Sequence, residues 1–369
     1  MKKHDVLIIG GGIIGVALGL RLADEKLSVA IIERGEPGRE ASWAAAGMLA
    51  PTSEAGHGAD GALPPPLAQL ATASAALYPE WLERLPGSAK LDVGYRTEGT
   101  LDVAFTNEEA ATLKGLPGEW LMAAEAWRLE PALSERIVAA VRLPHDVQVD
   151  NRRLFAALLE AARAAGVRFR AGTVAEPAIE GARAAGVRTS EGELVAAGIV
   201  VNAAGCWASQ LGEHGRRLTP TRPVRGQMIA LRGDAEKSLL RHVVRSPRGY
   251  ILPRADGRLV CGSTTENAGY DKSLTPGGLR QLLSAAIELV PAAASLPFAD
   301  AWAGLRPDSP DHLPILGATD IENYFVATGH YRNGILLAPI TAQLVGDVVL
   351  GCKPQISLES FSPLRFPAA

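Results

Sequence analysis

The chain has 369 residues, enough for two domains with separate cores, and its hydrophobic content of 47% is typical of a folded globular protein. The formal net charge is −3 and the charges are scattered, so no nucleic-acid surface is predicted. Cys206, Cys261 and Cys352 lie far apart without a C-x-x-C pair, which argues against a disulfide framework or a zinc site and favours a reducing, cytoplasmic setting. With no apolar run near the roughly 18 residues that span a bilayer, and a first strand from about Val6, we expect neither a membrane segment nor a signal peptide.

The stretch VLIIGGGIIG predicts a strand that turns into a helix. Residues 6–9 form a short apolar run typical of a buried strand, and Gly10, Gly12 and Gly15 then fit the pattern G-x-G-x-x-G. The first glycine allows a sharp turn, the second lets a pyrophosphate approach the main chain, and the third lets a helix from about Ile13 pack closely on the sheet. The N-terminus of that helix supplies free N–H donors and a partial positive charge.

A second strand and an acidic residue complete a β-α-β unit. The helix continues over residues 16–23, and LSVAIIE (residues 27–33) returns as a strand that ends at Glu33. A carboxylate there can accept hydrogen bonds from both ribose hydroxyls of an adenosine. The glycine pattern alone also fits a strand-to-helix turn that binds nothing, but the complete unit predicts a dinucleotide, either FAD or NAD.

Further elements follow in chain order. Residues 67–85 have a helical pattern, GYRTEGTLDVAF (residues 94–105) reads as strands, and residues 151–165 predict a helix that stops at Gly166. We expect residues 167–170 and then Thr173 and Val174 to return to the parallel sheet. Residues 193–211 read as a strand that runs into a glycine and a helix start, at the end of a sheet where such folds bind ligands.

From Arg222 the sequence changes to short β-rich runs separated by Pro, Gly and Asp, which predict antiparallel strands. NYFVATGH (residues 323–330) then predicts a strand and the residues from Gly334 a long helix. We therefore predict an α/β fold, α+β overall, with a Rossmann-like nucleotide-binding domain and a second, mainly antiparallel β-sheet domain for substrate. The predicted nucleotide domain is discontinuous, with residues 1–85, 145–220 and 300–369, and the substrate domain has residues 86–144 and 221–299.

Five motifs in order carry a resemblance over nearly the whole chain: IIGGGIIG, EASWAAAGMLAP, VVNAAGCWA, GLRPDSPDHLPILG and GHYRNGILLAP. The chain resembles the FAD-dependent amine and amino-acid oxidases built like D-amino-acid oxidase, and within them looks most like the glycine oxidases of thiamine biosynthesis. The resemblance implies that FAD is bound non-covalently. Covalent attachment through a cysteine, as in monomeric sarcosine oxidases, would need one near Leu305 or Arg306, and none is there.

The resemblance also implies a set of cofactor-binding residues. The expected FAD site has three parts. They are Gly10, Gly12, Ile13, Ile14, Gly15, Glu33 and Arg34; Ser42, Ala46, Gly47, Met48, Val174, Gly205 and Trp207; and His330, Tyr331, Arg332, Asn333, Gly334, Ile335 and Leu336. The helix from about Gly334 would direct its positive end at the flavin's pyrimidine edge, unless it is an ordinary glycine-flanked helix start.

For the substrate, the resemblance implies three catalytic residues. Arg306 would pair with the substrate carboxylate, since a guanidinium fork fits a carboxylate bidentately. Tyr250 would help to hold the same carboxylate, or is a core residue. Arg332 takes a second substrate-side position, or a structural one. Two positions depart from the family pattern: Arg248 replaces a histidine, which predicts a more cationic entrance, and Thr265 falls where a bulkier Met can sit above the flavin.

The reaction implied is oxidative deamination of glycine and other small amines or D-amino acids, such as sarcosine, D-alanine and D-proline. A hydride passes to the flavin, and the products are an imine or 2-oxo acid (glyoxylate from glycine), ammonia and hydrogen peroxide, feeding thiamine thiazole synthesis. No protein acid or base is required if the neutral amine binds, so orientation and charge stabilisation would carry catalysis.

Three alternatives stay open: a D-amino-acid dehydrogenase, a sarcosine or proline oxidase, and a non-enzymatic flavin-binding protein, against which Arg306 weighs. The expected partners are a small amino acid and dioxygen, with no nucleic acid and no membrane, and a homo-oligomer is left open. The histidines show no spacing for a metal site or a catalytic triad: His57, His145, His214, His242 and His312.

Overall fold

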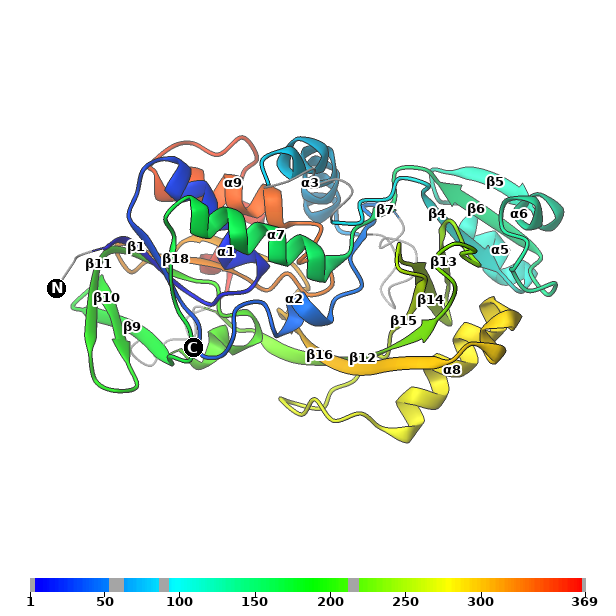
Figure 1. Cartoon of the computed structure of the whole chain (residues 1–369). Helices are drawn as coiled ribbons and strands as arrows, with labels where there is room; N and C mark the ends of the chain where they lie inside the picture. The colour runs from blue at the N-terminus through cyan, green and yellow to red at the C-terminus, as the bar shows by residue number, and fades with distance from the viewer. Residues whose placement is uncertain (1–3, 53–62, 86–92, 212–218, 367–369) are drawn as a thin grey trace.

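A computed structural model describes residues 4–52, 63–85, 93–211 and 219–366 of the chain. Two large sheets lie side by side (Figure 1). Two long strands of the second sheet, β12 (Arg222–Arg232) and β16 (Phe298–Asp308), extend toward the first sheet. His57 and His214 lie outside the described residues, as does most of the connector between residues 52 and 66. Within the described ranges, none of the helices is long and apolar enough to cross a membrane.

The first sheet contains the predicted β-α-β unit. Its strands lie in the order β17 (Ile315–Ala318), β18 (Tyr324–Thr328), β11 (Leu194–Asn202), β1 (His4–Ile9), β2 (Val29–Ile32) and β8 (Arg168–Arg170), with a hairpin of β9 (Ala175–Glu180) and β10 (Arg183–Thr189) joined to β11. β1 pairs in parallel with both β2 and β11. Strand side chains alternate between faces, so Val6 and Ile8 enter one core cluster while Leu7 and Ile9 enter another.

Helices cover the face of the first sheet to which Val6 and Ile8 point (Figure 1). They are α1 (Ile13–Asp24), α3 (Pro65–Glu83), α7 (Asn151–Ala164) and α9 (Ala338–Val349). α7 shows why such a sequence is helical: Asp150 caps its N-terminus by accepting from the amides of Arg152 and Arg153, and its Leu154 and Leu158 are buried on one side.

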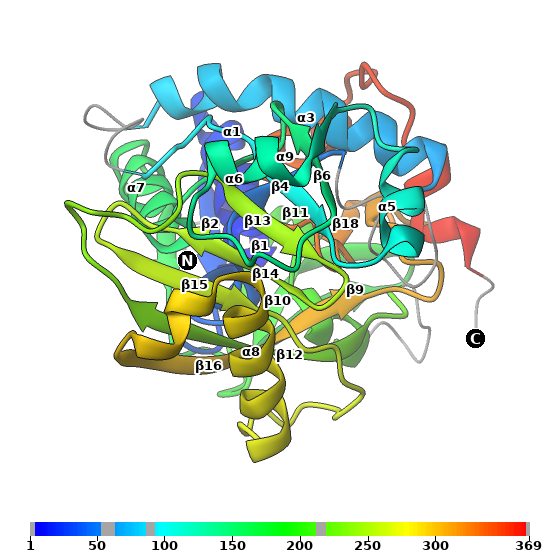
Figure 2. The same cartoon turned by 90° about the vertical axis from the view of Figure 1, so that its right-hand side faces the viewer.

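The second sheet is mainly antiparallel, which confirms the predicted fold class. Its order is β16 (Phe298–Asp308), β12 (Arg222–Arg232), β15 (Arg258–Gly262), β14 (Gly249–Pro253), β13 (Val243–Ser246), β4 (Thr100–Ala104), β6 (Ala139–Leu143) and β5 (Glu119–Met122). Among these described strands β13 and β4 pair in parallel, and the other neighbours pair antiparallel. Its accompanying helices are α5 (Asn107–Leu113), α6 (Ala123–Leu129) and α8 (Pro276–Leu289). Figure 2 shows this side of the molecule, where α8 packs on β12, β14 and β15.

Three local predictions are wrong. Thr173 and Val174 do not return to the parallel sheet; they precede β9, whose partner is the antiparallel β10. The last helix begins at Ala338 rather than near Gly334, because the intervening residues form turns. Residues 300–308 belong to β16 and pair with β12 of the second sheet. The remaining domain boundaries stay a prediction.

Candidate functional site

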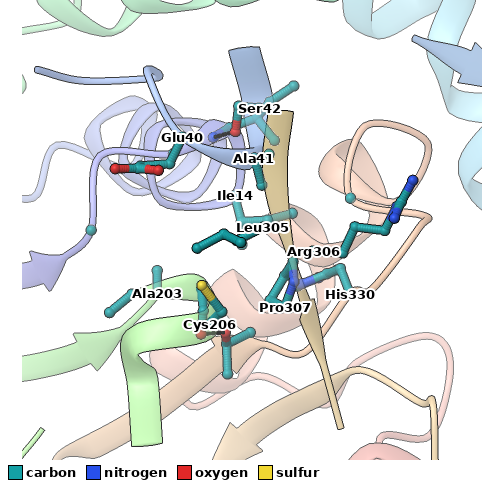
Figure 3. Close-up of a pocket in the computed structure, with 18 of the residues that line it drawn as sticks. Ile14, Glu40, Ala41, Ser42, Ala203, Cys206, Leu305, Arg306, Pro307 and His330 are labelled. Carbon is teal, nitrogen blue, oxygen red and sulfur yellow. Dashed lines mark hydrogen bonds between the residues drawn. The ribbon is translucent and has the colours of Figure 1, made fainter. Parts of the chain in front are cut away.

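A cavity of about 470 Å³ lies where the two sheets meet. Figure 3 labels ten of the residues that line it, and they come from distant parts of the chain. Ile14 belongs to α1, and Glu40, Ala41 and Ser42 belong to the segment of α2 (Ala41–Ala44). Ala203 and Cys206 follow β11, Leu305, Arg306 and Pro307 belong to β16, and His330 lies in the loop after β18. All the predicted cofactor residues line this cavity except Gly15 and Leu336, and the predicted Tyr250, Arg306 and Arg332 line it too.

The N-terminus of α1 opens into the cavity as the glycine pattern predicts. The amide of Ile13 donates to Ser42 Oγ at 2.9 Å, and among the described residues no protein acceptor faces the amides of Gly12 and Ile14. These N–H groups are directed as a pyrophosphate requires. Small side chains at Ala44, Ala45 and residues 203–205 leave room beside them, so the residues present fit a dinucleotide.

The two glycines that frame the turn are needed for different reasons. Gly10 has φ +111°, and a Cβ there would lie 2.4 Å from the carbonyl oxygen of Ala203. Gly15 lies outside the cavity lining, but a Cβ there would lie 2.1 Å from the carbonyl oxygen of Gly10. A Cβ at Gly15 would also lie 3.3 Å from the side chain of Ile8 in β1, so this glycine allows α1 to pack closely on the turn and on the sheet, which is the third role expected of the pattern.

Glu33 holds the glycine turn from the neighbouring strand. One carboxylate oxygen accepts from the amide of Gly11 at 2.7 Å, and the other accepts from the amide of Gly35 at 2.9 Å. Each carboxylate oxygen has further lone pairs, so ribose hydroxyls can bind the same group. The sequence predicted the ribose contact alone, and the structure adds the two backbone contacts.

We expect Glu33→Ala to weaken FAD binding by roughly 1.5–3 kcal/mol, the range for hydrogen bonds to a charged group. Glu33→Gln is the matched variant, because it keeps one acceptor oxygen while removing the charge. A flavin titration of the apoprotein measures the effect. If the parent, Glu33→Ala and Glu33→Gln proteins bind FAD with equal affinity, Glu33 does not contact the ribose.

A ring stack forms one end of the cavity. The Arg34 guanidinium carbon lies 3.5 Å from the centre of the Trp207 ring, and Tyr270 lies on Trp207 with 5.7 Å between ring centroids. Trp207 follows Gly205, whose φ is +59°, in the short helix η2 (Gly205–Gln210). Arg34 also pairs with Glu40 at 2.9 Å. The stack gives this end of the cavity a flat wall with a guanidinium on its face, which the sequence did not predict.

Arg254 supports the turn at residues 46–48, which the sequence analysis assigned to the cofactor without identifying its support. Arg254 donates to the carbonyl oxygens of Ala46 and, at 2.7 Å, of Val149. Burial lowers the pKa of Arg254 to about 10, so the side chain stays charged at neutral pH. Gly47 has φ +78°, and a Cβ there would lie 2.2 Å from the carbonyl oxygen of Val149. The only sequence signal for Arg254 was a cation at the end of the apolar run GYILP.

The loop after β18 lines the opposite wall. His330 is buried, its Nε2 lies 3.0 Å from Thr341 Oγ1, and burial lowers its pKa to about 3, so the ring is neutral. Tyr331 has φ +47° and its amide donates to the carbonyl oxygen of Pro307 at 2.8 Å. Leu336 lies outside the lining, and its carbonyl oxygen accepts from Ser74 Oγ. Because the helix starts only at Ala338, turns rather than a helix N-terminus face the cavity here.

The Arg306 guanidinium lies in the cavity wall, where it donates hydrogen bonds to groups of two neighbouring segments. Nη1 donates to the carbonyl oxygens of Arg225 at 3.3 Å and of Thr264 at 3.2 Å, and Nη2 donates to Ser263 Oγ at 2.8 Å. Ser263 was missed by the sequence analysis, because only the pairing of β12 with both β15 and β16 brings it beside Arg306. These bonds fix the orientation of the Arg306 guanidinium, which the resemblance pairs with the substrate carboxylate.

Tyr250 reaches the cavity from β14. Its side chain is 8% exposed and its hydroxyl donates to Met228 Sδ at 3.3 Å. A thioether is a weak acceptor, so the hydroxyl can turn to a carboxylate oxygen at little cost. Gly262 lies opposite in β15, and a Cβ there would lie 2.5 Å from the hydroxyl oxygen, which explains the small residue.

The two departures from the family pattern do not act as expected. Arg248 Nη1 pairs with Glu109 at 2.8 Å and its Nε with Glu288 at 3.0 Å, away from the cavity lining. The expectation of a more cationic entrance is therefore wrong. Thr265 is exposed and also lies outside the cavity lining, which includes Ser263 and Met228 instead.

Cys206, His242 and His312 have packing or paired roles in the part of the chain that the structure describes. Cys206 lines the cavity, but burial raises its pKa to about 12, so it stays a thiol as expected of a packing residue. His242 pairs with Glu130 and His312 with Asp308, each at 2.7 Å. Across the described ranges, no group of His, Cys, Asp and Glu could hold a metal ion.

Comparisons with known proteins agree with this geometry. A family model described as DAO, FAD dependent oxidoreductase, matches residues 5–348. The chain is 37% identical over 375 residues to a glycine oxidase of Geobacillus kaustophilus, with 98% of this chain and 97% of that protein covered. The crystal structure of the Geobacillus kaustophilus glycine oxidase has a TM-score of 0.90 at 36% identity and covers all of both chains.

A further relative is longer than this chain. The chain is 39% identical over 368 residues to the bifunctional protein ThiO/ThiG of Synechocystis sp., with 98% of this chain covered but only 54% of that protein, so it spans about half the length of this relative. The family match covers most of the chain and includes the glycine turn, Glu33, β16 and the loop after β18. The chain therefore belongs to the DAO family of FAD-dependent oxidoreductases.

Proposed function

We propose that the chain oxidises glycine and similar small amino acids, with dioxygen as the electron acceptor, to an imine that hydrolyses to a 2-oxo acid and ammonia. Glycine would give glyoxylate, and sarcosine, D-alanine and D-proline are the other candidate substrates. The names of the relatives support an oxidase of glycine, and the resemblance in the motifs supports a role in supplying thiamine thiazole synthesis. We propose a cytoplasmic setting for this reaction.

The proposal is supported by the position of Arg306, whose guanidinium lies in the cavity wall between Ser263 and Gly226. We assign the substrate carboxylate to Arg306 and the Tyr250 hydroxyl, because a guanidinium fork and a hydroxyl together can fix the orientation of a carboxylate. Gly226 and Gly304 line the same part of the cavity and contribute no side chain, which leaves room for a short substrate.

FAD, when bound, supplies the two-electron acceptor that dioxygen reoxidises with formation of hydrogen peroxide. The chain's own groups bind and orient the amino acid and exclude water around it. His330 is neutral, and no acid or base is assigned to the amine, so a substrate with a neutral amine needs no proton transfer to the protein.

An oxygen electrode tests the proposal. The yellow holoenzyme should consume dioxygen and form peroxide with glycine, and sarcosine, D-alanine and D-proline define its range. Acid precipitation should leave the FAD in the supernatant, because the sequence has no cysteine next to Leu305 or Arg306 to hold it covalently. Reduction of the flavin by these amino acids without dioxygen consumption, but with transfer of electrons to a quinone, would support a dehydrogenase instead.

A further inference from the structure

Arg306 packs against the main chain on the side that faces away from the cavity, and the significance of this side rests on the proposed carboxylate-binding role of that residue. A Cβ at Gly226 would lie 2.3 Å from Arg306 Nη2, so the guanidinium lies directly against the main chain of β12. Its acceptors come from two segments, the carbonyl of Arg225 in β12 and Ser263 and Thr264 after β15. The position of Arg306 therefore depends on how these two segments are joined.

Glu266 joins them through its side chain. One carboxylate oxygen accepts from Thr264 Oγ1 at 2.5 Å and from Gln227 Nε2 at 2.8 Å, and the other accepts from Arg225 Nη2 at 2.6 Å. The hydroxyl of Thr264 also accepts from the amide of Gln227 at 2.8 Å. A single carboxylate thus contacts both residues whose carbonyl groups hold Arg306.

The main chain of Glu266 adds to the same junction. Its amide donates to the carbonyl oxygen of Arg225 at 3.0 Å, and its carbonyl oxygen accepts from the amide of Arg225 at 2.9 Å. The carbonyl of Arg225 therefore receives hydrogen bonds from both Glu266 and Arg306. A shift of Glu266 would move an acceptor of the guanidinium directly.

The charges are consistent with a permanent ion pair. The Arg225 side chain is 7% exposed and Glu266 is 28% exposed. Burial alone would raise the pKa of Glu266, but the hydrogen bonds from Thr264, Arg225 and Gln227 outweigh it and hold that pKa below its usual range. The carboxylate is charged at neutral pH and so accepts strong, oriented hydrogen bonds.

We propose that Glu266 is a positioning residue for substrate binding: by joining Arg225, Gln227 and Thr264, it fixes the acceptors that orient the Arg306 guanidinium toward a carboxylate in the cavity. Glu266 does not line the cavity and acts on the substrate only through Arg306.

Asp271 offers a matched control. Asp271 Oδ2 lies 2.8 Å from Nη1 of the same Arg225 guanidinium, but the Asp271 side chain is 54% exposed. Removing its charge leaves the contacts between Glu266, Thr264 and Gln227 in place. A comparison of Glu266→Gln with Asp271→Asn therefore separates positioning of Arg306 from neutralisation of Arg225.

The test uses holoenzyme and acetate, a carboxylate without an amine, titrated by the change in flavin absorbance. We expect Glu266→Gln to raise the acetate Kd by about 10- to 100-fold, the range for a displaced binding group. The KM for glycine should rise by the same factor. The rate of oxidation of glycinamide, which has no carboxylate, should not change. Asp271→Asn should stay within about 2-fold of the parent, a change near 0.4 kcal/mol. Arg306→Ala provides the reference for complete loss of the anchor.

The outcomes are distinct. A normal acetate Kd in Glu266→Gln, with a raised Kd in Arg306→Ala, overturns the positioning role and leaves the proposed function intact. A normal Kd in Arg306→Ala overturns the carboxylate anchor itself. If Glu266→Gln does not fold, Thr264→Val, which removes the hydroxyl at nearly constant shape, is compared with Thr264→Ser, which keeps it; equal acetate binding by these two contradicts the proposal.

Discussion

Arg306→Ala is expected to cost about 2–5 kcal/mol of substrate affinity, because the carboxylate would be left unpaired in a partly buried cavity. FAD should remain bound, since the proposed cofactor contacts come from other parts of the cavity: the glycine turn, the segment of residues 40–48 and the loop after β18. Steady-state kinetics with glycine and a flavin spectrum of the same preparation measure both effects.

Two comparisons make this result specific. Arg306→Lys should restore only part of the affinity, because an ammonium offers a point charge rather than a fork. The alanine variant should also lose its preference for glycine over glycinamide. Oxidation of glycine by Arg306→Ala with unchanged KM and kcat would mean that the anchor is misassigned, and Arg332, which lines the same cavity, would be the next candidate.

The second large effect is expected at Gly10. An alanine there must adopt φ +111°, which costs about 1–3 kcal/mol, and its Cβ would lie 2.4 Å from the carbonyl oxygen of Ala203. Relief of that clash requires β1 and β11 to separate at the turn, so we expect a total destabilisation of more than about 3 kcal/mol. Urea unfolding of the apoprotein, followed by fluorescence, measures it.

Gly12 provides the control for Gly10. Its φ of −75° suits any residue, and a Cβ there would meet only Ser42 Oγ, at 3.4 Å. Gly12→Ala should therefore unfold at the same urea concentration as the parent but bind FAD less tightly, because the methyl group enters the cavity beside the free amides. Equal stability of Gly10→Ala and Gly12→Ala would show that the turn does not need its glycine.

The parts of the fold that sequence alone predicts are those with local causes. The first β-α-β unit follows from an apolar run, a glycine turn and a second apolar run within residues 4–33, and α7 follows from its cap at Asp150 and its apolar stripe. Thr173 and Val174 were misplaced because a short β-prone run does not specify its partner strand. The late start of α9 has a different cause: residues 334–337 include two leucines, which favour a helix, but they form turns in which the amide of Leu337 donates to the carbonyl oxygen of Asn333 and the amide of Ala338 to that of Ile335.

Residues of the candidate site could be predicted where they lie in a sequence motif, but not where the pairing of distant strands brings them together. Arg306, Tyr250 and Glu33 lie in recognisable motifs and line the cavity. Ser263 and Glu266 lie beside Arg306 only through the register of β12 with β15 and β16, which no local pattern encodes. Arg248 failed as an expectation for the same reason, because its partners Glu109 and Glu288 are contributed by α5 and α8.

The strand order of the first sheet also determines when, during synthesis, the cofactor site can exist. β1 is a central strand, yet its neighbour β11 begins only at Leu194, and β18 follows at Tyr324. The edge of β1 next to the glycine turn therefore stays unpaired in a nascent chain until more than half of the 369 residues have been translated, and the cavity wall at His330 is added later still. Long-range pairing of this kind is slow, because the loop must close before its contacts form. FAD capture is thus a late event, and the partly made chain must be kept from pairing its open β1 edge with other molecules.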